Sequence, residues 1–159
     1  MEHETLSSHK YQKPIRLKGY DYTSDAAYAI TMRAKYHCYI LCHPHLRHIL
    51  ETEWTNLAQR FPGVEPATFM VMPDHVHCML IIHEEAKGTF SVSQVIGAYK
   101  SIVFKVWRTH IQETGINLPM SIWQRRFYEH VVRDDSDFAA QTAYILNNPI
   151  KAALDKPKS

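Results

Sequence analysis

The sequence predicts an α+β fold, in which an antiparallel sheet of the ferredoxin-like, split βαβ type carries one further helix at its C-terminal end. At 159 residues, with 45% hydrophobic and 21% charged residues, the chain has the size and composition of one globular domain. Its apolar residues follow strand and helix periods in the order β-α-β-β-α-β, and a last helical segment comes after them. That order puts the third strand inside the sheet and both crossover helices on one face, so the last helix can cover only the other face.

The strands are indicated by alternating apolar and polar residues and by the turn residues between them. Three are predicted at residues 27–33, 67–72 and 75–83, and residues 123–133 are predicted to be a loop that runs into the fourth strand. Pro73-Asp74 is a tight turn, which makes the second and third strands an antiparallel hairpin.

The two crossover helices are indicated by apolar residues at helical spacing and by residues typical of helix ends. The first begins at Pro44 and ends before Pro62-Gly63. The second is capped by Ser91 or Ser93. Its apolar stripe is Val92, Val95, Ile96, Tyr99, Val103, Val106 and Trp107.

The third strand carries the most informative pattern, His75-Val76-His77. Residues two apart on a strand share a face, so both imidazoles point the same way, with Cβ atoms about 7 Å apart, and can hold one divalent ion. The alternate residues point toward the core: Val76, Cys78, Leu80 and Ile82. In a chain with 11 histidines such a pair also arises by chance, so the spacing alone does not establish a metal site.

The last helix is predicted from about Ser136 to Asn148, with Asp134 and Asp135 as caps and Pro149 as its end. Two lines of side chains run along it, the apolar Phe138, Thr142 and Ile145 and the polar Gln141, Tyr144 and Asn148. The phenol of Tyr144 can overlook the histidine pair, and the amide oxygen of Asn148 can be a third ligand. Alternatively, Tyr144 packs its ring and exposes its hydroxyl, as most tyrosines do.

Composition excludes several classes of protein. The formal net charge of +2 does not indicate a nucleic-acid binder, so any basic surface has to be local. No apolar run approaches the ~20 residues of a membrane span, and no secretory signal is expected. Three cysteines suit a reducing, cytoplasmic location. Cysteines and histidines crowd residues 37–48, but a second ligand pair is missing, so this cluster is interpreted as incidental.

Basic residues that can contact DNA occur in three places: Arg16 and Lys18 among aromatics, Lys100 on the second helix, and Arg125 and Arg126 before the fourth strand. The first two can equally belong to a solvated edge, and Lys100 to a solvated helix face. The domain is expected to span residues 16–152, between a flexible tail at 1–15 and a short tail at 153–159.

Taken together, the ordered motifs resemble the HUH-type tyrosine transposases that act on single-stranded DNA, in particular the REP-associated tyrosine transposases. The matching segments are residues 16–22, 72–77, 93–101, 123–130 and 144–149. They span nearly the whole chain, and the ordered set is far more specific than the histidine pair alone.

The resemblance implies that His75 and His77 bind Mg²⁺ or Mn²⁺ and that Tyr144 attacks the scissile phosphate, which gives a 5′-phosphotyrosine link and a free 3′-hydroxyl. Rejoining reverses this step, and the DNA is expected to contain a hairpin. Related enzymes carry Gln in place of Asn148. The tyrosine can serve its own subunit or a partner, so a monomer and a homodimer are both compatible with the sequence.

Several assignments have alternatives. Tyr128 competes with Tyr144 as the nucleophile, but the family motif matches Tyr144. Asp74, His130 and Gln141 are candidates for supporting the site, and His130 can also be an ordinary polar residue of a strand. At the level of function, the alternatives are a non-catalytic binder of single-stranded or hairpin DNA and a metal-dependent nuclease that uses water.

Overall fold

The computed structural model describes residues 25–35 and 39–155, with side chains as far as Asn147. The strands are β1 (Ala26–Ala34), β2 (Val64–Val71), β3 (His75–Ile82) and β4 (Trp123–Val132). The helices are α1 (Pro44–Arg60), α2 (Val92–Thr114) and α3 (Asp135–Asp155), and two 3-10 turns are η2 (Ile40–Cys42) and η3 (Glu84–Ala86).

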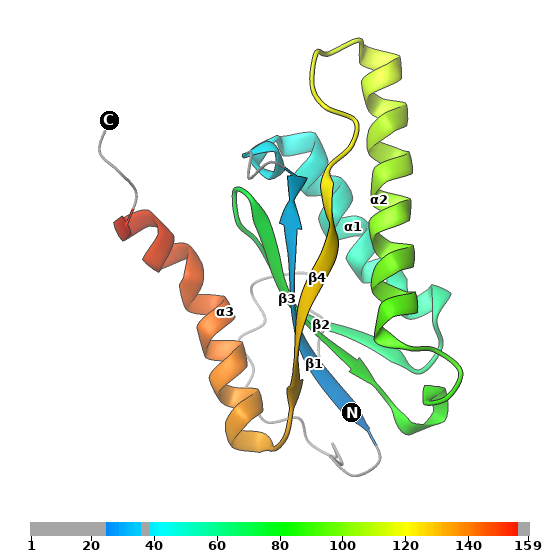
Figure 1. Ribbon diagram of the computed structural model, residues 1–159, viewed down its shortest axis with the longest axis vertical. Helices are drawn as coiled ribbons and strands as arrows, with labels where there is room; N and C mark the ends of the chain where they lie inside the picture. Colours follow the sequence, from blue (N-terminus) through cyan, green and yellow to red (C-terminus); the bar gives the residue numbers. More distant parts are fainter. Residues whose placement is uncertain (1–24, 36–38, 156–159) are drawn as a thin grey trace.

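The strands form one sheet in the order β2-β3-β1-β4, with every neighbouring pair antiparallel (Figure 1). This is the predicted split βαβ arrangement, and it places β3 and β1 at the centre. In the register of these two strands, Thr31 pairs with His77 and Arg33 pairs with His75. Paired residues on antiparallel strands share a face, so these four side chains lie together.

One face of the sheet packs against α1 and α2 and forms the larger core. The predicted inward residues of β3 are all in it: Val76, Cys78, Leu80 and Ile82. The buried Tyr99 hydroxyl donates to the Leu50 carbonyl at 2.8 Å, which ties α2 to α1. Ser91 and Gln94 form a capping box at the start of α2, whereas Val106, predicted to be buried, is 38% exposed.

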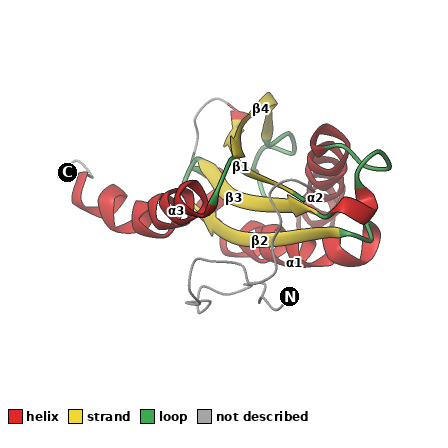
Figure 2. Cartoon of the chain, turned by 90° about the horizontal axis from the view of Figure 1, so that it is seen from below, coloured by secondary structure: helices red, strands yellow, loops and turns green. Residues whose placement is uncertain are grey.

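Among the described elements, only α3 covers the opposite face of the sheet (Figure 2). Phe138 and Ile145 pack there against Met79 and Ile81, and the Thr142 hydroxyl contacts the Met79 sulfur at 3.2 Å. Burial of each large apolar side chain contributes about 1.5–3 kcal/mol, so a few contacts fix this helix. The helix therefore lies on the face where the histidine pair emerges.

The largest differences from the predicted element boundaries occur in two elements that contain a proline. The last helix begins at Asp135, where the Asp134 side chain accepts from the Asp137 amide at 2.8 Å, and continues through Pro149 to Asp155. A proline lacks one N–H and costs about 3 kcal/mol within a helix, but the amides on either side of it can still bond. Strand β2 begins at Val64 and contains Pro66, which an edge strand tolerates.

No described helix is both long and apolar enough to cross a membrane.

Candidate functional site

The two histidines of β3 converge on one point. Their ring centroids are 4.5 Å apart, and the Nε2 atoms of His75 and His77 are 3.1 Å apart. Neighbouring ligands at right angles around a divalent ion, each at about 2.1 Å, are about 3.0 Å apart. The pair therefore fits two adjacent positions of one octahedral ion.

The outer nitrogens of both rings are held by neighbouring side chains. The Nδ1 of His75 is 2.7 Å from an oxygen of Asp74, and the Nδ1 of His77 is 3.1 Å from the hydroxyl of Thr31. An Nδ1–H that donates to the carboxylate leaves the Nε2 lone pair of His75 free for a metal, and the Thr31 hydroxyl can accept from His77 in the same way. These contacts are those expected of metal-binding histidines.

The surroundings keep His77 neutral. It is 8% exposed, and its pKa is lowered to about 4, first by burial, then by the charges of His75 and Arg33. A neutral imidazole is the form that binds metals. His77 is therefore ready to act as a ligand over the whole neutral range of pH.

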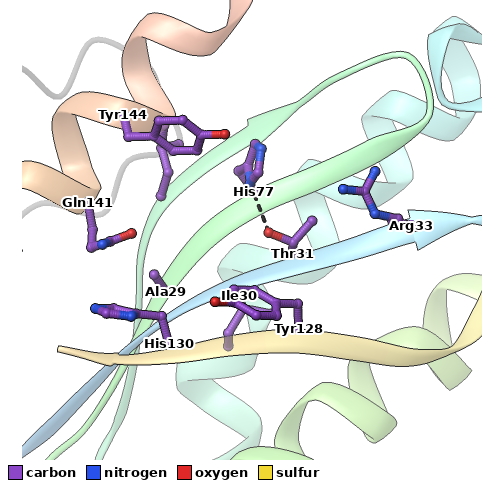
Figure 3. A pocket seen from close by; sticks show the side chains of 10 residues that line it. Ala29, Ile30, Thr31, Arg33, His77, Tyr128, His130, Gln141 and Tyr144 are labelled. Carbon is purple, nitrogen blue, oxygen red and sulfur yellow. Dashed lines mark hydrogen bonds between the residues drawn. The ribbon is translucent and has the colours of Figure 1, made fainter.

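Tyr144 approaches the histidine pair from α3. Its ring centroid lies 5.6 Å from that of His77, and its side chain is 56% exposed. Both rings open onto a cavity of about 330 Å³ between α3 and the sheet (Figure 3). Its polar lining consists of Thr31, Arg33, His77, Tyr128, His130, Gln141 and Tyr144.

The other side of the cavity is built by β4 and the first turns of α3. His130 Nε2 lies 2.9 and 3.1 Å from the two oxygens of Asp137, and Gln141 Nε2 donates to the same carboxylate at 3.4 Å. Burial raises the pKa of Asp137, but hydrogen bonds from His130, Gln141 and a backbone amide outweigh it and lower the pKa overall. His130 thus contacts α3 and not the histidine pair. Tyr128, 67% exposed, is on the same cavity.

The candidate DNA-binding residues have different surroundings. Lys100 is on α2, where its ammonium donates to the carbonyls of Gln124 and Arg125 at 2.8 and 3.4 Å, and burial lowers its pKa. Arg125 and Arg126 are exposed on β4. Arg16 and Lys18 lie outside the described residues, as does the side chain of Asn148, whose backbone belongs to α3.

Two residues of the cavity were missed by sequence reasoning, Thr31 and Arg33. Both alternate with buried residues of the first strand, which put them on its open face, but only the register with β3 brings them beside the histidines. A polar residue in a predicted strand does not by itself indicate which residue of another strand lies beside it.

Of the Cys/His cluster at residues 37–48, His37 and Cys38 lie outside the described residues. His43 accepts from the His45 amide at the start of α1, and the His45 ring stacks on His110 with centroids 3.6 Å apart. Across the described part of the chain, no three His, Cys, Asp or Glu side chains are grouped so that they could hold a metal ion. The described carboxylates, thiols and imidazoles thus add no third ligand to the pair on β3.

Comparisons with known proteins show which family the chain resembles. The profile of the family described as "Transposase IS200 like" matches residues 22–148. A Haemophilus influenzae protein without an assigned function is 31% identical over 164 aligned residues, covering 88% of this chain and 89% of its own length. The Escherichia coli REP-associated tyrosine transposase is 32% identical over 83 residues, which is 52% of this chain and 42% of that protein.

Among solved structures, a REP-associated tyrosine transposase bound to a REP hairpin has the same fold, with a TM-score of 0.61 and 22% identity over 91% of this chain and 74% of that one. The family profile covers most of the chain and includes the histidine pair and Tyr144. The chain belongs to the IS200-like family of transposases.

Proposed function

We propose that this protein cleaves and rejoins single-stranded DNA, with Tyr144 as the nucleophile and with His75 and His77 as ligands of Mg²⁺ or Mn²⁺. The observation that carries the proposal is the position of the phenol: the Tyr144 ring is 5.6 Å from the ring of His77, whose Nε2 is 3.1 Å from that of His75. The proposed nucleophile thus lines one cavity with His77, one of the two proposed ligands.

The ion would polarise the scissile phosphate when bound. Asp74 and Thr31 would hold the two imidazoles with their Nε2 atoms inward, and the amide oxygen of Asn148, one turn after Tyr144 on α3, is the proposed third ligand. Neutral ligands would leave the ion its full charge, which favours a phosphodiester.

In the proposed cleavage, the Tyr144 oxygen forms a bond to phosphorus while the bond from phosphorus to the 3′-oxygen breaks. The phenol loses its proton, and the 3′-oxygen gains one from water. The products are a 5′-phosphotyrosine link and a free 3′-hydroxyl, and rejoining reverses the step. Because the link conserves the phosphodiester's energy, no nucleotide cofactor is needed.

The proposed substrate is single-stranded DNA with a hairpin, by analogy with the relative whose structure holds a REP hairpin. The exposed Arg125 and Arg126 on β4 are suited to its phosphates, and Arg16 and Lys18 remain candidates. Lys100 is a weaker candidate because its ammonium already donates to carbonyls of β4. His130 and Gln141 would hold the first turns of α3 through Asp137.

The 5.6 Å distance between the Tyr144 and His77 rings is within one chain, which supports a site completed by a single subunit. Both a monomer and a homodimer can contain such a site.

The test is covalent capture of DNA. A labelled oligonucleotide, with a hairpin and single-stranded flanks taken from DNA next to the gene, is incubated with the protein in Mn²⁺ and run on a denaturing gel. We expect an adduct with the wild type and with Tyr128→Phe, the control for the other tyrosine of the cavity, and none with Tyr144→Phe.

The other outcomes separate the alternatives. An adduct that persists in Tyr144→Phe removes this residue from its role. Salt-sensitive binding without an adduct in the wild type indicates a non-catalytic DNA binder. Cleavage without an adduct indicates a nuclease that uses water.

A further inference from the structure

The cavity contains one cationic side chain with no part in the function proposed so far, that of Arg33. It is exposed at the end of β1, paired in register with His75, and lines the cavity with His77 and Tyr144. Within the described residues, no carboxylate forms an ion pair with its guanidinium, and no other Lys or Arg side chain lines this cavity. Its charge is therefore available to a ligand.

The position of Arg33 relative to the nucleophile is informative. Figure 3 shows the Tyr144 ring and the Arg33 guanidinium on opposite sides of the His77 ring. In phosphoryl transfer the attacking and leaving oxygens are roughly in line, on opposite sides of phosphorus. With the phosphate at the histidine pair and Tyr144 attacking from α3, the leaving oxygen points toward the side of Arg33.

We propose that the Arg33 guanidinium donates hydrogen bonds to the 3′-oxygen that leaves during cleavage. This role rests on the proposed function, because it assigns a residue to the second oxygen of the same displacement. As the bond from phosphorus to this oxygen breaks, negative charge develops on it, and a fixed cationic donor stabilises that charge.

Arg33 acts here as a donor and not as an acid. A guanidinium does not give up its proton in proteins, so the proton that ends on the 3′-hydroxyl comes from water. In the reverse reaction, the same donors stabilise the 3′-oxygen as it attacks the phosphotyrosine. Both directions should therefore depend on Arg33.

Sulfur substitution of the leaving atom gives a specific test. The cleaved position is first mapped on the hairpin oligonucleotide, and a second substrate then carries sulfur in place of that 3′-oxygen. A thiol, with a pKa of about 8.5, is a far stronger acid than water or an alcohol, so a thiolate leaves with far less stabilisation than an alkoxide. Rates of adduct formation are measured in Mn²⁺, which accepts both atoms, at saturating DNA.

We expect Arg33→Ala to slow adduct formation on the oxygen substrate by about 10²-fold, the effect of removing one oxyanion donor, and to come within about 10-fold of wild type on the sulfur substrate. Arg33→Lys, which keeps the charge, should lie between. The matched control is Arg126→Ala, an exposed arginine of β4 outside the cavity, whose effect should be the same on both substrates. Thermal unfolding monitored by circular dichroism verifies that each variant is folded.

Equal slowing of Arg33→Ala on both substrates would overturn the proposal and leave Arg33 as a DNA-binding residue, with the proposed function intact. A rate unchanged from wild type on the oxygen substrate would overturn it as well. Failure of the wild type to form an adduct with either substrate would overturn the proposed function and this inference together.

Discussion

Replacement of Asp74 by Asn tests how the histidine pair is prepared for a metal. The Asp74 carboxylate lies 2.7 Å from Nδ1 of His75, and the two side chains are 28% and 18% exposed. The hydrogen bond selects the tautomer with a proton on Nδ1 and leaves Nε2 free. An amide keeps the shape of the side chain but removes its charge, so the preference for this tautomer weakens.

The size of the effect follows from the contact. A hydrogen bond to a charged group contributes about 1.5–3 kcal/mol, and loss of the partner of a metal-binding histidine lowers metal affinity about 10- to 100-fold, or about 1.4–2.7 kcal/mol. Because Asp74 is partly exposed, solvent screens its charge. We therefore expect Asp74→Asn near the lower limit of about 10-fold and Asp74→Ala closer to the upper limit.

The assay is titration with Mn²⁺, with the free ion followed by electron paramagnetic resonance. Asp137→Asn is the matched control, because Asp137 also binds a histidine, His130, but on the far side of the cavity from the pair. Its metal affinity should equal that of the wild type. Unchanged affinity in both Asp74 variants would refute the assignment of Asp74 as the residue that fixes the tautomer of His75.

Three further predictions concern the same face of the sheet. Thr31→Val removes the hydroxyl 3.1 Å from His77 Nδ1 and should weaken Mn²⁺ binding about 10-fold. Thr142→Val, the same change at a hydroxyl that contacts the Met79 sulfur, should leave Mn²⁺ binding unchanged. Equal Mn²⁺ affinities of the two variants would contradict the role of Thr31. The pKa of His77 is lowered from 6.5 to about 4 by folding, so the folded protein binds a proton at His77 less readily than the unfolded chain does. The free energy of unfolding should therefore be highest above pH 6.5 and should decrease as the pH falls toward 4, by at most about 3 kcal/mol. Urea unfolding across this range should show a shallower decline for His77→Gln, and parallel curves would count against a buried neutral imidazole. Phe138→Ala should weaken the docking of α3 by about 3 kcal/mol, seen as faster amide hydrogen exchange in α3 than in α2; equal exchange in both helices would contradict separate docking.

Much of this architecture could be predicted because local patterns determine it. The period of two on β3 put His75 and His77 on one face and their neighbours in the core, and the order of the elements left that face to the last helix. The line of Phe138, Thr142 and Ile145 then fixed the side of the helix that packs. Tyr144, two positions from Thr142, was thereby directed toward the rim of the cavity.

What the sequence did not reveal depends on contacts between distant segments. Both prolines lie inside elements that their local preference predicts they should interrupt: Pro66 is tolerated because β2 is an edge strand, and α3 continues through Pro149. Arg33 and Thr31 acquire their positions from the pairing of β1 with β3, which a single sequence does not encode locally. The sequence predicts that Lys100 contacts DNA, whereas in the structure its partly buried ammonium donates to a carbonyl of β4.

The most direct test of the central claim is to locate the DNA on the protein. Tandem mass spectrometry of a protease digest of the captured adduct identifies the residue that carries the 5′-phosphate of the cleaved strand. The proximity of Tyr144 to the histidine pair predicts the phosphate on Tyr144. A phosphate on Tyr128, or on any other residue, would contradict the account.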